Sequence, residues 1–182
     1  MSKIAVIGYS VFLFANITLA DQPSPYVGLQ QREIKALSPQ ETQEYLEGKG
    51  MGFAKAAELN HFPGPLHVLQ LADKLGLTPE QWARTEQIRA AMQQQGKALG
   101  RALVQKEREL DRSFSSGDID AATLRVLVTE IGRLQAEVRS AHLQAHLEQK
   151  AILTPAQVAA YDKFRGYVPA TDSQHPHNSD EQ

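Results

Sequence analysis

The chain carries one short stretch twice: Leu-Thr-Pro-Glu-Gln at residues 77–81 and Leu-Thr-Pro-Ala-Gln at residues 153–157. In both copies the threonine is a good N-cap, because its hydroxyl can accept a hydrogen bond from an unpaired N–H of the first turn. The proline that follows has a φ preset for helix. The glutamine falls at the third helical position, where its side chain can reach back to the cap in a capping box. Each stretch therefore predicts the start of a helix.

Two long amphipathic segments lie between these stretches, separated by the break Ser-Ser-Gly-Asp at residues 115–118. In the second segment, apolar or small residues recur at steps of three and four, which is the strongest periodicity of the chain. They are Leu124, Leu127, Ile131, Leu134, Val138, Ala141 and Ala145. The first segment has a similar but interrupted stripe: Trp82, Met92, Gly96, Leu99, Leu103, Leu110 and Phe114. Gly96 and Gly100 are interpreted as sites where another helix approaches closely.

An all-α fold follows, because two long helices joined by a short loop pack antiparallel at a shallow angle. We expect a long antiparallel helical hairpin from Pro79 to about Phe114 and from about Asp118 to about Ile152. A third helix should run from Pro155 to about Tyr167. Shorter flanking helices are expected over residues 26–37, after the capping box at residues 38–41, and over residues 51–59 and 66–75.

Residues 1–20 look like a secretory signal peptide, with Lys3 before an apolar run and a small residue, Ala20, at the cleavage site. An uncleaved membrane anchor is the alternative. Cleavage after Ala20 would export the protein, in a Gram-negative cell to the periplasm. The predicted organisation is then a signal peptide (1–20), a short-helix segment (21–65), the hairpin domain (66–167) and a disordered tail (168–182). The chain has no cysteine, so the exported domain cannot rely on disulfides.

His142 and His146 are the most suggestive polar pair, because their spacing of four residues puts both imidazoles on one helix face. Pairing the two long helices about the loop places Glu86 one step from His146, and His67 could fold back to the same level. Imidazole and carboxylate together suit Zn²⁺, Ni²⁺ or Cu²⁺. The alternative is that both histidines are simply solvated, or paired with a nearby glutamate.

Catalysis has little support in the sequence. It contains no cysteine nucleophile, no His-Glu-x-x-His motif, no Gly-rich phosphate loop and no Gly-x-Ser-x-Gly elbow. We therefore expect a protein that is not an enzyme. The formal net charge of -2 gives no sign of nucleic-acid binding.

Basic residues spread along both long segments could form a rim around an apolar surface that holds unfolded clients loosely. An ordinary solvated exterior is the alternative. The basic residues are Arg84, Arg89, Lys97, Arg101, Lys106, Arg108, Arg112, Arg125, Arg133 and Arg139.

The two Leu-Thr-x-x-Gln stretches, flanking a long helical hairpin behind an export signal, resemble the LTxxQ family of bacterial periplasmic proteins. That family includes Spy/CpxP-type chaperones and ZraP/CnrX-type heavy-metal resistance and sensor proteins. The resemblance covers about residues 66–167 and implies a Spy/CpxP-like, hook-shaped helical hairpin that is often a homodimer. In the metal-sensing branch the pattern of ligands corresponds here to His67, Glu86, His142 and His146. Leu71 departs from that pattern, since the sensors carry a second upstream histidine there.

The function predicted first is a periplasmic envelope-stress chaperone that binds unfolded or misfolded envelope proteins without ATP. The alternative is a periplasmic sensor or resistance protein that binds Zn, Ni or Cu. A third interpretation is a module that docks on a membrane sensor kinase or an anti-sigma protein.

Overall fold

The computed structural model describes residues 23–168. The predicted signal peptide and nearly all of the predicted tail lie outside these residues. Residues up to Gln31 form a unit of their own, in which a short 3₁₀ helix, η2 (Leu29–Gln31), is described. The prediction of a helix over residues 26–37 is therefore wrong, except for this single turn. Gly28 has a φ of +90°, which is incompatible with a continuous α-helix.

The second unit, from Arg32 onward, is built from α-helices, and the described part of the chain contains no strand. The all-α prediction is confirmed. The helix predicted over residues 66–75 is divided at Leu71 into two short helices. The helices are α1 (Pro39–Glu47), α2 (Lys55–Glu58), α3 (Pro65–Gln70), α4 (Ala72–Leu75), α5 (Pro79–Ser116), α6 (Ala121–Ile152) and α7 (Pro155–Arg165).

The capping boxes predicted from the sequence are present at the starts of α1, α5 and α7. Thr78 Oγ1 accepts a hydrogen bond from the N–H of Gln81 at 3.2 Å, and the Gln81 side chain accepts one from the N–H of Thr78 at 3.0 Å. Thr154 and Gln157 repeat this exchange at 3.2 and 2.9 Å. Both repeated stretches are thus confirmed as helix starts.

The two glutamines of the repeated stretches also bind each other. Gln81 Nε2 donates to Gln157 Oε1 at 2.8 Å, and Gln157 Nε2 donates to Gln81 Oε1 at 2.9 Å. Gln81 Nε2 further donates to the Ile152 carbonyl at 2.9 Å, at the end of α6. The repeated motif therefore joins the start of α5 to the junction of α6 and α7, in addition to capping two helices.

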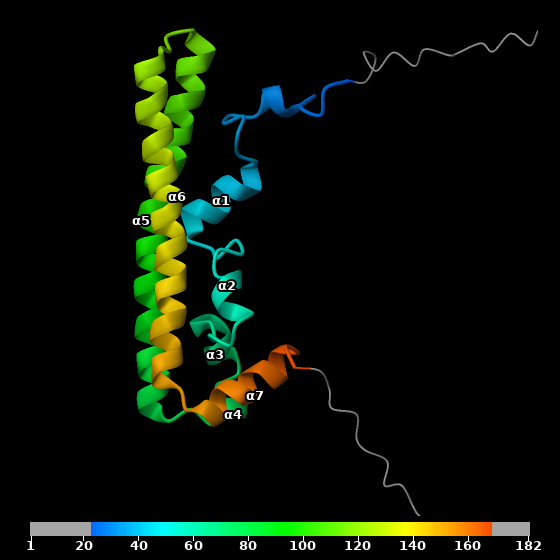
Figure 1. Ribbon diagram of the computed structural model, residues 1–182, viewed down its shortest axis with the longest axis vertical. Helices are drawn as coiled ribbons and strands as arrows, with labels where there is room; N and C mark the ends of the chain where they lie inside the picture. Colours follow the sequence, from blue (N-terminus) through cyan, green and yellow to red (C-terminus); the bar gives the residue numbers. More distant parts are fainter. Residues whose placement is uncertain (1–22, 169–182) are drawn as a thin grey trace, which may run out of the picture. The chain divides into compact units, whose positions relative to one another are not determined.

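Helices α5 and α6 form the predicted antiparallel hairpin and lie side by side along most of their length (Figure 1). The apolar stripe of α6 is buried from Leu127 to Ala145, as its spacing predicted. Its first member, Leu124, is exposed, and so are Trp82 and Phe114 of the α5 stripe. Ile88 and Val104 are buried on α5 in their place, because the interrupted stripe of this helix left its inward face poorly defined.

Helices α1, α2 and α3 follow one another along one side of the hairpin (Figure 1). Helix α1 crosses α5 at Gly100, where a Cβ atom would stand 2.0 Å from the carbonyl oxygen of Tyr45. One turn earlier on α5, a Cβ on Gly96 would stand 3.4 Å from the Cα of Gly48. The prediction of close helix approach at Gly96 and Gly100 is confirmed.

The described residues contain two apolar clusters. The larger lies between residue 34, α1 and the middle of the hairpin, and includes Tyr45, Leu103 and Leu134. The smaller joins α3, α4 and α7 and includes Val68 and Tyr161. Between residues 23 and 168, no helix has both the length and the apolar character needed to cross a membrane.

Candidate functional site

The inward face of α6 changes from apolar to polar after Val138. His142 is 3% exposed and His146 8% exposed, and Gln149 beyond them is fully buried. Gln149 Nε2 donates to Thr85 Oγ1 on α5 at 3.1 Å. This contact agrees, to within one residue, with the pairing of the two helices inferred from the loop position. Both histidines are therefore buried on the inward side of α6, together with Ala141 and Ala145.

Both histidines line a cavity of about 310 Å³ between the hairpin and the segment that runs from the end of α1 to α3. His67 on α3 lines the same cavity, together with the Glu58 carboxylate and the Met92 thioether. Three of the four side chains predicted as metal ligands are thus brought to one place. The lining residues are Gly50, Met51, Gly52, Ala54, Lys55, Glu58, Gly64, Pro65, Leu66, His67, Met92, His142 and His146.

His146 has a fixed orientation. Its Nδ1 lies 2.8 Å from the carbonyl oxygen of Phe62, so the Nδ1–H donates to that carbonyl and Nε2 is the ring nitrogen left for a ligand. A histidine that binds a metal usually has its other ring nitrogen held in this way. The ring also lies against Gly64, where a Cβ atom would stand 2.9 Å from Cε1. Only glycine fits at that position without displacing the imidazole.

The Nε2 atom of His142 is buried and has no hydrogen-bond partner within residues 23–168. Burial lowers the pKa of His142, and the neighbouring His146 lowers it further. The ring is therefore neutral at pH 7, which is the form that can bind a metal. Phe53 packs against this ring with the centroids 5.9 Å apart. An unpaired buried nitrogen is unfavourable unless a ligand or a water satisfies it.

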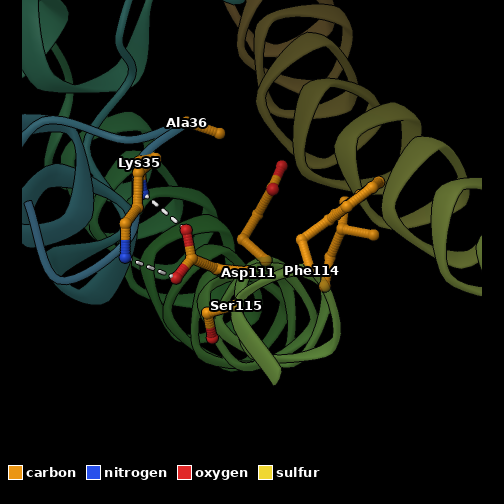
Figure 2. A pocket seen from close by; sticks show the side chains of 7 residues that line it. Lys35, Ala36, Asp111, Phe114 and Ser115 are labelled. Atoms are coloured by element: carbon orange, nitrogen blue, oxygen red, sulfur yellow. Dashed lines mark hydrogen bonds and ion pairs between the residues drawn. The ribbon is translucent and has the colours of Figure 1, made fainter. Parts of the chain in front are cut away.

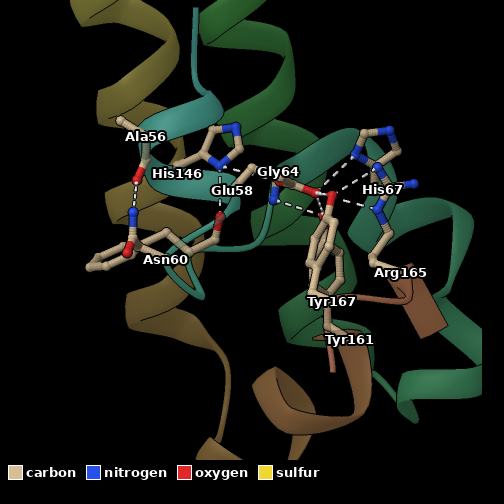
Figure 3. A network of polar contacts seen from close by, with 10 residues as sticks. Ala56, Glu58, Asn60, Gly64, His67, His146, Tyr161, Arg165 and Tyr167 are labelled. Atoms are coloured by element: carbon tan, nitrogen blue, oxygen red, sulfur yellow. Dashed lines mark hydrogen bonds and ion pairs between the residues drawn. The ribbon is translucent and has the colours of Figure 1, made fainter. Parts of the chain in front are cut away.

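Glu58 is the centre of a polar network formed with the C-terminal part of the chain (Figure 3). Its Oε1 accepts hydrogen bonds from the hydroxyls of Tyr161 at 2.5 Å and Tyr167 at 2.8 Å. The Arg165 guanidinium donates to the same oxygen at 3.3 Å. Desolvation and the bond to Glu58 raise the pKa of Tyr161. The carboxylate is thereby held in place from one side.

The other carboxylate oxygen of Glu58 points toward the cavity. Oε2 lies 3.7 Å from His146 Nδ1, is buried and has no hydrogen-bond partner among the described residues. His67 completes the group from α3, with its Nδ1 3.7 Å from Glu58 Oε1. Burial lowers the pKa of His67, followed by the positive charge of Arg165. A carboxylate oxygen and an imidazole nitrogen are thus both buried here without a partner.

Glu86 is half-buried on α5 and is not among the residues that line this cavity. The carboxylate found there, Glu58, comes instead from α2. Sequence reasoning missed it because the register of the hairpin locates only residues on α5 and α6. Met92 was assigned to the apolar stripe, and its position in the cavity was also missed. A single methionine or glutamate that follows two alanines, as Met92 and Glu58 do, gives no signal of its own.

In the part of the chain that the structure describes, no three histidine, aspartate or glutamate side chains stand close enough together to hold a metal ion. A metal would therefore have to draw these side chains inward by rotation about their side-chain torsions. The two unpaired atoms, His142 Nε2 and Glu58 Oε2, have no hydrogen bond to lose in such a movement. The donor types fit a transition-metal ion, because imidazole, carboxylate and thioether groups are all represented.

Residues 52–160 match a family described as heavy-metal resistance. The match begins before α2 and ends within α7, and it includes every titratable residue that lines the cavity. No curated protein and no solved structure matches the chain.

Proposed function

Since the chain belongs to the heavy-metal resistance family, the family of LTxxQ proteins that its two repeated stretches indicated, we propose that it binds a transition-metal ion in the histidine cavity. The observation that carries this proposal is the convergence of His67, His142 and His146 with Glu58 on one cavity, where two of their polar atoms are buried without partners. Zn²⁺, Ni²⁺ and Cu²⁺ are the candidates, because imidazole suits all three.

The three histidines and Glu58 would each contribute differently to the metal site. His146 is oriented by the Phe62 carbonyl so that Nε2 is free to bind. His142 contributes a neutral ring at the same helix face, and His67 contributes a third ring from α3. Glu58 supplies negative charge that offsets the charge of the ion. A bound ion would satisfy the unpaired atoms and link α2, α3 and α6.

We also propose where and how the protein acts. The signal-like residues 1–20 support export to the periplasm. The protein would act by binding, without catalysing a reaction. A homodimer, or a complex with a membrane sensor kinase or an anti-sigma protein, would convert metal binding into a stress response.

Calorimetric titration of the chain from Asp21 with Zn²⁺, Ni²⁺ and Cu²⁺ tests the proposal. We expect submicromolar binding of at least one ion, and loss of that binding in the double variant His142→Ala/His146→Ala. His61→Ala is the matched control, because His61 is exposed, pairs with Asp162 and does not line the cavity. Unchanged binding in the double variant, or no binding by the native chain, would refute the metal site.

A pair of single variants distinguishes the carboxylate found in the cavity from the one expected from the sequence. Glu58→Gln should weaken metal binding more than Glu86→Gln does. Since Glu58 also holds Tyr161 and Tyr167, the melting temperature of each variant is measured alongside. If Glu86→Gln weakened metal binding more than Glu58→Gln, the ligand set predicted from the sequence, with Glu86, would be supported instead.

A second candidate function, holding unfolded clients, is supported by exposed apolar side chains near the turn of the hairpin. Phe114 is 58% exposed, and Val126 and Val128 are 67% and 50% exposed. Of these, Val126 lines a groove of about 600 Å³ together with Leu127 and the charged side chains of Lys106, Arg125 and Glu130. Apolar groups with a charged rim are typical of protein-binding surfaces.

The test is suppression of aggregation of an unrelated unfolded protein, without ATP and at near-stoichiometric amounts. The variant Val126→Ser/Val128→Ser should lose this activity. Leu147→Ser is the matched control, because Leu147 is also an exposed apolar residue of α6 but lies toward the other end of the helix. No suppression by the native chain, or equal loss in both variants, would exclude a client site near the turn.

A further inference from the structure

A second cavity, of about 470 Å³, lies near the C-terminal end of α5. It shares no residue with the histidine cavity, and of its lining only Phe114 was named above, as an exposed apolar side chain near the turn. Figure 2 shows Lys35 and Asp111 on one side of this cavity and Phe114 on the other. The remaining lining residues are Ala36, Glu107, Leu110 and Ser115.

One of the two carboxylates in this cavity is fully paired. Asp111 Oδ2 accepts a hydrogen bond from Lys35 Nζ at 2.9 Å, and Oδ1 accepts one from the backbone N–H of Lys35 at 3.0 Å. These bonds neutralise Asp111 and attach residue 35 to α5. The Lys35 ammonium therefore pairs with Asp111. Among the residues that line the cavity, Glu107 then carries a negative charge that no lining residue compensates.

Glu107 is only 7% exposed as a residue, and within residues 23–168 its carboxylate makes no hydrogen bond or ion pair, but its oxygens are not among the fully buried atoms without a partner. Burial raises the pKa of this carboxyl. The carboxylate oxygens therefore remain accessible from the cavity, where they are a negative charge without a protein partner. A bound cation would pair with this charge, and the position of Glu107 in the wall of a cavity gives such a cation a place.

The rest of the wall is apolar. Leu110 follows Glu107 by one turn on α5, and Phe114 follows Leu110 by another, so the three side chains share one face of the helix. Phe114 keeps 58% of its surface exposed, which leaves its ring available to a ligand. An aromatic face attracts cations as well as apolar groups.

We propose that this cavity binds a small organic ammonium ion, whose charged nitrogen pairs with Glu107 and whose apolar body lies against Leu110 and Phe114. The chemistry of the walls excludes the other ligand classes. An anion would be repelled by Glu107, and a neutral apolar compound would leave the Glu107 carboxylate without a partner. A hydrated inorganic cation would gain nothing from the two apolar side chains.

Phenethylammonium is a suitable probe, because it carries one ammonium group on a short aromatic body. Binding to the full chain is measured by calorimetry at pH 7, beside 2-phenylethanol, which has the same body without charge, and methylammonium, which has the charge without the body. We expect only phenethylammonium to bind measurably. Glu107→Gln should weaken that binding at least tenfold, and Phe114→Ala should weaken it without altering a buried group.

Asp118→Asn is the matched control, since Asp118 is an exposed carboxylate in the hairpin turn close to the cavity, and this variant should bind like the native chain. Equal binding of 2-phenylethanol, or unchanged binding in Glu107→Gln, would overturn the proposal. So would tighter binding of N-acetyl-lysine amide than of phenethylammonium, because it would assign the site to a lysine of a protein partner. Absence of binding by every probe would overturn it as well.

Discussion

Gly100→Ala tests how tightly α1 is fitted to the hairpin. A Cβ atom at this position would stand 2.0 Å from the carbonyl oxygen and 2.7 Å from the carbonyl carbon of Tyr45. Both are backbone atoms in the last turns of α1, so neither can rotate away as the end of a flexible side chain could. The whole of α1 would have to move off α5, which would also loosen the packing of Tyr45 in the larger apolar cluster.

The expected magnitude combines two opposed effects. Replacing glycine by alanine inside a helix stabilises the helix by about 1 kcal/mol. Forcing extra atoms into a packed interface typically costs about 1–3 kcal/mol, and occasionally more. Because the clash is with backbone, we expect the upper end of that range or beyond, and a net loss of about 2 kcal/mol. In a chain of this length, such a loss lowers the melting temperature by about 4–8 °C.

Gly132→Ala is the matched control. It lies in the middle of α6, is exposed, and a Cβ atom there would meet nothing within 4 Å. This variant should gain about 1 kcal/mol from helix propensity alone. Gly96→Ala should fall between the two, since its nearest contact would be 3.4 Å. Chemical denaturation gives all three free energies of unfolding, and a Gly100→Ala variant as stable as the native chain would refute the close approach of α1.

Three further predictions concern the helix starts, the joint between them and the second cavity. Thr78→Ala and Thr154→Ala should each cost about 0.5–2 kcal/mol of unfolding free energy, and no loss in denaturation would mean that the motif does not cap its helices. A double-mutant cycle of Gln81→Ala and Gln157→Ala should give a coupling of about 0.5–3 kcal/mol, whereas additive losses would contradict the reciprocal amide pair. Because burial raises the pKa of Glu107 above 4.5, the folded chain holds that proton more strongly than the unfolded chain, and stability falls as pH rises through the folded pKa. Glu107→Gln should therefore raise the melting temperature at pH 7 but change it little near pH 4, and an equal rise at both values would contradict this cause.

The helical framework could be predicted because its signals are local. The Thr-Pro-x-Gln starts depend on residues within one turn of each other, and the spacing from Leu127 to Ala145 repeats over several turns. The segment before α1 could not be predicted in the same way. Its apolar residues suit a helix, but Gly28 adopts a positive φ and Ile34 is buried in the larger cluster. Tertiary packing there outweighs a weak local preference.

Only the part of the candidate site that lies on the hairpin could be predicted from the sequence. His142 and His146 could be placed because both belong to α6, whose inward face the apolar spacing defines. Thr85 is a polar residue that breaks the apolar spacing of α5, yet it is fully buried and bonded to Gln149. A polar residue opposite another polar residue can satisfy a buried interface, and a pattern of apolar residues alone does not reveal such pairs.

The two functions proposed for this chain depend on opposite ends of the hairpin, and this makes them separable. The histidine cavity lies beside Met92 and His146, whereas the exposed valines at 126 and 128 lie near the turn. Variants of one region leave the side chains of the other untouched, and effects at well-separated sites usually add. If metal changes client binding, the coupling must pass through α5 and α6 or through the α1–α2 segment. Gly100→Ala displaces α1 from α5, so a loss of metal-dependent client binding in this variant would show that the contact between α1 and the hairpin takes part in the coupling.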